Sequence, residues 1–143
     1  MKKLTQICSI LCLVFAFSII SANAQTMKKV KADIPFDFNL RGTQYRAGNY
    51  KLRITDLRPG VRVYLTDNKN NVLDSFLVTV AGEAPSGAPE LVFNNYDGQR
   101  FLSRITTRET IYDIIRTSAE RQIASRKKRA DKRPEIVAIA IGY

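Results

Sequence analysis

The chain has 143 residues, a net charge of +10 and no histidine. Its start predicts an export signal, because the basic pair Lys2-Lys3 precedes the apolar run Ile7–Ile20 and the small-residue motif Ala22-Asn23-Ala24. Cleavage is expected between Ala24 and Gln25, and it would remove both cysteines. Residues 25–143 then exclude a disulfide, a Cys/His zinc site and a Ser-His-Asp triad.

These features predict a protein exported through the inner membrane and located in the periplasm or outside the cell. After a signal of residues 1–24, the remaining 119 residues carry a net charge of +8 and have the size of one domain. The only long apolar run of the sequence lies in the signal, is too short to span a bilayer and is followed by the cleavage site. No transmembrane helix is therefore expected in the mature chain.

The first predicted strand runs from Val30 to Phe38, where apolar and polar residues alternate. Pro35 cannot donate a hydrogen bond, which places this strand at a sheet edge. The stretch Val72 to Val80 has apolar residues on both faces and is predicted to be a central strand. Between these two lie a short extended piece at Gln44-Tyr45 and the alternating runs Tyr50–Ile54 and Val61–Thr66.

The second half contains a strong hairpin signal, Asp97-Gly98, between the runs Glu90–Tyr96 and Gln99–Thr106. A two-residue loop would pair Phe93 with Leu102, whereas a three-residue loop with a bulge would pair Phe93 with Phe101. Thr110 to Ile115 fits either a strand or a helical turn.

A capping box formed by Thr117 and Glu120 predicts a helix over about 117–132, followed by a last strand near 136–141. The expected fold is mainly β. It is an antiparallel sandwich or a small, partly open barrel of seven or eight short strands, with one C-terminal helix before the last strand.

Most of the charge excess lies in this helix, and residues 116–143 have a net charge of +5. In an exported protein, a basic helix indicates acidic envelope glycans or lipid headgroups as partners rather than nucleic acid. A solvated helix face is the alternative interpretation. The candidate polyanion contacts are Arg126, Lys127, Lys128, Arg129, Lys132 and Arg133.

Catalytic chemistry has little support in the sequence. Asp33 and Asp37 share a strand face about 13 Å apart, too far for a retaining glycosidase pair, so a carboxylate-based hydrolase is a remote alternative. The polar segment Asp67–Asn71 has Lys69 at the third position of a calcium loop and is predicted to be a plain turn. No catalytic, cofactor or metal residue is assigned. The main hypothesis is a non-catalytic envelope protein with a structural or binding role.

Several short motifs, in this order, resemble a family of small exported bacterial proteins of unknown function. The motifs are Ile34-Pro35-Phe36-Asp37-Phe38, Ala47-Gly48-Asn49-Tyr50, Leu91-Val92-Phe93 with Tyr96, Phe101-Leu102-Ser103 and Ser118-Ala119-Glu120-Arg121. The family often has proline before the Ala-Gly turn and histidine after the Leu-Val-Phe run, where this chain has Arg46 and Asn94. The resemblance implies an exported β-rich domain and nothing about catalysis.

Overall fold

The computed structural model describes residues 27–57, 59–129 and 134–143. The predicted export signal and its cleavage residues lie outside this part of the chain, as do Lys132 and Arg133.

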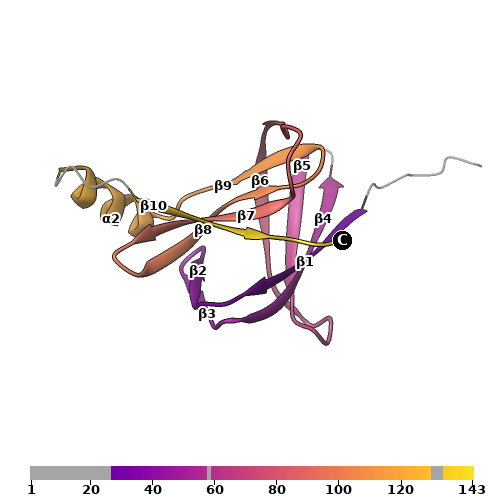
Figure 1. Ribbon diagram of the computed structural model, residues 1–143, viewed down its shortest axis with the longest axis horizontal. Helices are drawn as coiled ribbons and strands as arrows, with labels where there is room; N and C mark the ends of the chain where they lie inside the picture. The colour runs from indigo at the N-terminus through magenta and orange to yellow at the C-terminus, as the bar shows by residue number, and fades with distance from the viewer. Residues whose placement is uncertain (1–26, 58, 130–133) are drawn as a thin grey trace, which may run out of the picture.

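The described chain is mainly β with one helix before the last strand, which confirms the predicted fold class (Figure 1). It has ten strands, more than the seven or eight expected. The elements are β1 (Met27–Ile34), β2 (Phe38–Leu40), β3 (Thr43–Tyr45), β4 (Gly48–Leu57), β5 (Gly60–Thr66), β6 (Val72–Glu83), β7 (Glu90–Tyr96), β8 (Gln99–Thr106), β9 (Thr110–Ile114), α2 (Ser118–Arg129) and β10 (Glu135–Ala140).

All strands belong to one sheet with the order β1-β4-β5-β6-β9-β8-β2-β3, and β7 pairs with both β8 and β10. The neighbours are antiparallel except for β2 and β8, which make a single parallel pairing, so the sheet is mixed. It does not close into a barrel. One isolated bridge joins Lys31 on β1 to Gly142, two residues after the end of β10. The Lys31 N–H donates to the Gly142 carbonyl at 2.7 Å, and the Gly142 N–H donates to the Lys31 carbonyl at 3.0 Å.

One of the extra strands arises at Pro35, where the predicted strand Val30–Phe38 is divided. β1 ends at Ile34, and β2 begins only at Phe38. Between them the chain turns, and the Asp37 carboxylate accepts a hydrogen bond from the Ala47 N–H at 2.8 Å. Proline cannot donate to a ladder, so a break at this position follows from its chemistry.

The core forms on the inner side of the curved sheet from alternate residues of nearly every strand. Phe38 and Phe93 are fully buried at its centre, with their ring centroids 5.6 Å apart and the planes at 73°. Phe36 packs edge-on against Phe93 at 5.2 Å. This inward packing directs the intervening polar residues to the outer face of the sheet.

The two ambiguous segments are resolved. Phe93 pairs with Leu102, so the hairpin has the two-residue loop, and Asp97 and Gly98 both have positive φ (52° and 89°), as a type I′ turn requires. Residues 110–114 form strand β9. Strand β6 lies between β5 and β9, which confirms its central position. Its outward Leu77 is nevertheless 52 % exposed.

A candidate anion-binding face

The basic helix α2 projects beyond the β7–β8 hairpin (Figure 1). Lys127 forms an ion pair with Asp97 in the hairpin turn, whereas Arg126 and Lys128 are exposed. The side chain of Arg129 lies outside the described residues, so only three of the six candidate contacts can be placed. Their role in polyanion binding remains a prediction.

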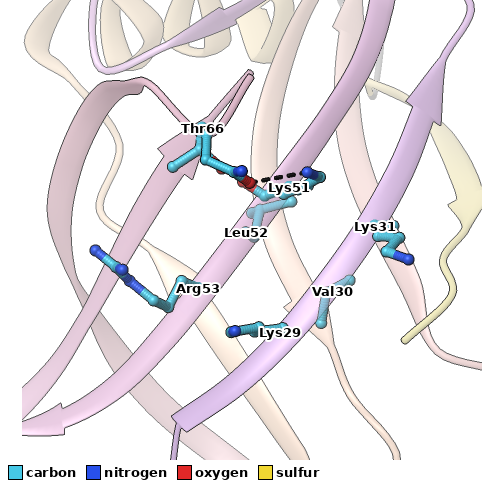
Figure 2. A pocket seen from close by; sticks show the side chains of 8 residues that line it. Lys29, Val30, Lys31, Lys51, Leu52, Arg53 and Thr66 are labelled. Carbon is cyan, nitrogen blue, oxygen red and sulfur yellow. Dashed lines mark hydrogen bonds between the residues drawn. The ribbon is translucent and has the colours of Figure 1, made fainter. Parts of the chain in front are cut away.

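A different group of cations lines a surface pocket of about 350 Å³ over strands β1 and β4 (Figure 2). We call Lys29, Lys31, Lys51 and Arg53 the basic face. No lining residue is acidic, and the nearest carboxylate along β1 is that of Asp33, outside the lining. The complete lining is Lys29, Val30, Lys31, Lys51, Leu52, Arg53, Thr66 and Asn70.

The register of β1 and β4 places cations directly opposite each other. Lys29 pairs with Arg53, and Lys31 pairs with Lys51. Directly opposed like charges destabilise an antiparallel pair. The face therefore concentrates positive charge at a cost in stability, which a bound anion would offset.

Period-two alternation explains why these side chains share one face. Val30 and Leu52 are fully buried in the core and point inward, so their sequence neighbours point outward. Figure 2 shows the outward side chains on the two adjacent strands. The core therefore fixes where the basic face lies.

Two of the four cations are held in place by neighbouring groups. The Lys51 ammonium donates to the Asn70 side-chain oxygen at 2.8 Å and to the Asn68 carbonyl at 3.2 Å. The Arg53 guanidinium lies 4.6 Å from the ring centroid of Tyr64, its cross-strand neighbour on β5. Stacking holds the guanidinium plane while its N–H edge stays available to an oxyanion.

The sequence alone indicates part of the basic face. The alternating pattern already put Lys31 on the polar side of one strand and Lys51 and Arg53 on the polar side of another. The sequence pattern does not show that these two strands pair, or in which register. Their pairing places the cations of two separate polar strand faces side by side in one site.

Other polar groups are engaged within the fold. Asp67 closes its turn by accepting hydrogen bonds from the Asn71 side chain at 2.9 Å and the Asn71 N–H at 2.8 Å, which lower the pKa of its carboxyl. This confirms the predicted plain turn.

Arg104 and Asp113 pair at 2.7 Å beside a pocket of about 430 Å³. Residues 27–57, 59–129 and 134–143 contain no cluster of three or more Asp, Glu, His or Cys that could hold a metal.

Among the residues that the structure describes, Glu120 is the one buried carboxylate, and it lies in the first turn of α2. Its backbone N–H donates to Thr117 Oγ1 at 3.2 Å, which confirms Thr117 as the N-cap. Its side chain accepts from the buried Asn94 amide at 3.3 Å and lies 3.7 Å from the Arg116 Nε. Burial raises the pKa of the Glu120 carboxyl, against the lowering effects of Asn94 and Arg116.

Comparisons of the chain with protein-family models, with curated proteins and with solved structures find no match. In the described part of the chain, the single helix is too short and too polar to cross a bilayer. The function is therefore inferred from the geometry of the site.

Proposed function

We propose that this protein is an exported, non-catalytic binding domain for polyanions of the cell envelope. The observation that carries the proposal is the pair of like-charged cross-strand contacts, Lys29 with Arg53 and Lys31 with Lys51, in a pocket without an acidic lining residue. Such a cluster suits phosphate, sulfate or carboxylate groups, which bind cations through charge-assisted hydrogen bonds.

The expected affinity of one such site is weak. At roughly 1 kcal/mol per cation near an anionic surface, four cations contribute about 4 kcal/mol, a dissociation constant of about a millimolar. A polymer or surface with repeated charges would bind more tightly, because several sites or molecules engage it together. Salt would weaken the binding by screening.

The test is binding of fluorescein-labelled dextran sulfate, measured by anisotropy at low salt and at physiological ionic strength. The Lys29→Gln/Lys31→Gln variant changes two exposed β1 side chains and leaves the Lys51 contacts in place. We expect about a thirtyfold loss of affinity at low salt, from roughly 1 kcal/mol per charge removed. The same variant should be slightly more stable than the natural protein, since it relieves two like-charge contacts.

The matched control is Arg126→Gln/Lys128→Gln, which removes the same charge from the exposed part of α2. It should lose much less affinity. Equal losses in the two variants would mean that only net charge matters, and a larger loss in the helix variant would move the binding site to the basic helix. Either result would overturn the assignment to the basic face.

A further inference from the structure

A second pocket, of about 430 Å³, combines arginines with exposed aliphatic side chains. Arg41, Arg62 and Arg116 contribute the charge, and Leu77 and Ile115 contribute the apolar surface. Leu77 is 52 % exposed and Ile115 is 65 % exposed. The lining comprises Arg41, Arg62, Ser75, Phe76, Leu77, Ile115, Arg116 and Thr117, none of them acidic.

Through Arg62 and Leu77, this pocket adjoins the basic face on the outer side of the sheet. Arg53 on β4 pairs with Tyr64 on β5, and Arg62 lies two residues before Tyr64, so both arginines point outward from adjacent strands. Arg62 in turn pairs with Leu77 on β6. One outer surface thus runs from the lysines of β1 to the aliphatic side chains of β6 and the end of β9.

Two of the three arginines are positioned at this pocket by contacts that leave further N–H groups available. Arg41 donates one N–H to the Ser75 carbonyl at 3.4 Å. Arg116 has its Nε 3.7 Å from Glu120. A guanidinium has five N–H donors in a planar fork that matches phosphate oxygens, so each of these groups retains free donors.

The exposed leucine and isoleucine identify the kind of polyanion. A sulfated or carboxylated polysaccharide gains little from aliphatic side chains beside its charges. A bilayer surface offers both partners at once, with phosphates at the headgroup level and acyl chains directly below. Charge on one part of a surface and aliphatic residues on the adjoining part are the arrangement that such an interface favours.

We propose that the outer face docks on an anionic phospholipid bilayer, an inference that rests on the proposed function and specifies its partner. Lys29, Lys31 and Arg53 attract the surface. Arg41, Arg62 and Arg116 bind lipid phosphates. Leu77 and Ile115 enter the boundary between headgroups and acyl chains.

The experiment is sedimentation with vesicles of phosphatidylcholine alone and of phosphatidylcholine mixed with phosphatidylglycerol. Every variant is expressed from the full chain, and its N-terminus is read by sequencing, so that all variants are compared in the same form. We expect binding to the mixed vesicles only. The Leu77→Ser/Ile115→Ser variant should lose about tenfold in vesicle affinity and keep its affinity for dextran sulfate, since it retains every cation.

The control Val80→Ser/Ile136→Ser removes aliphatic side chains of similar exposure, 54 % and 67 %, that line neither of the two basic pockets. It should bind mixed vesicles like the natural protein. Unchanged vesicle binding by Leu77→Ser/Ile115→Ser, an equal loss in the control, or equal binding to neutral vesicles would overturn bilayer docking. None of these results would contradict the proposed polyanion binding, which dextran sulfate tests separately. If the natural protein did not bind dextran sulfate, the proposed function itself would be overturned.

Discussion

Single residues fix the turns that set the register of this sheet, and Gly98 is the clearest case. It has φ 89° and follows Asp97, which has φ 52°, so both central residues of the turn occupy the left-handed region. The Asn95 side-chain oxygen accepts a hydrogen bond from the Gly98 N–H at 2.9 Å. A Cβ on Gly98 would meet nothing within 4 Å. The requirement for glycine is therefore one of backbone conformation and not of space.

Replacing Gly98 with alanine should lower the free energy of unfolding by roughly 1–2 kcal/mol, the cost of a left-handed conformation for a residue with a Cβ. Urea denaturation measures the change. Gly87→Ala is the matched control, because Gly87 lacks a left-handed φ and its new Cβ would lie 3.7 Å from the Pro85 oxygen, an ordinary contact. The control should be neutral or slightly stabilising. Equal destabilisation at both glycines would contradict the argument from φ.

At the scale of elements, local patterns predicted most strands, but they did not predict the site. Alternation located β1, β4 and β5 because each strand has one face on the core. Asp97-Gly98 fixed one hairpin because its turn chemistry is local. The opposition of Lys29 to Arg53 depends on pairing between distant segments, which no short motif encodes. Exposed Leu77 likewise belongs to a central strand whose outer face stays uncovered, which its apolar pattern did not reveal.

The start of helix α2 also shows that a local sequence motif does not predict contacts with distant segments. A capping box predicts that the Glu120 carboxylate returns to the helix N-terminus, whereas here it contacts Asn94 on β7. Asn94 is only 6 % exposed, and its amide needs an acceptor once buried. Tertiary burial therefore directs Glu120 toward the sheet, and this contact joins α2 to the β-rich part of the molecule.

This anchor predicts a pH dependence with a definite sign. Because burial raises the pKa of Glu120 in the folded state, the folded protein binds more protons than the unfolded chain between the ordinary glutamate pKa and the raised value. The contribution of Glu120 to the free energy of unfolding is full below the ordinary glutamate pKa. It decreases as pH rises through the raised pKa of the folded state. Glu120→Gln keeps an oxygen for Asn94 and should remove this decline, as measured by urea unfolding from acidic to neutral pH.

The control for this pH effect is Glu83→Gln, which changes an exposed carboxylate on β6. Its pH profile should follow that of the natural protein. If Glu120→Gln retained the full decline with rising pH, the buried carboxylate would not be its source.

At the scale of the whole molecule, the C-terminal residues connect parts of the sheet that its strand ladders leave apart. Ile141 is 8 % exposed and donates its N–H to the Pro89 carbonyl at 3.0 Å. Gly142 bridges to Lys31 on β1. The Tyr143 hydroxyl accepts from the Arg108 N–H at 2.9 Å, and the Arg108 guanidinium stacks 4.7 Å from the ring centroid. This short segment thus holds β1, and with it the basic face, against β10.

Truncation after Ala140 should therefore destabilise the protein by about 3 kcal/mol, from the lost burial of one isoleucine and the lost hydrogen bonds. Hydrogen exchange gives a local measurement. The Lys31 amide donates to Gly142 at 2.7 Å and should exchange much faster once that acceptor is removed. Truncation after Gly142 removes only Tyr143 and should leave the Lys31 amide protected. If the two truncated chains exchanged Lys31 equally fast, the bridge would not be what holds β1 in place.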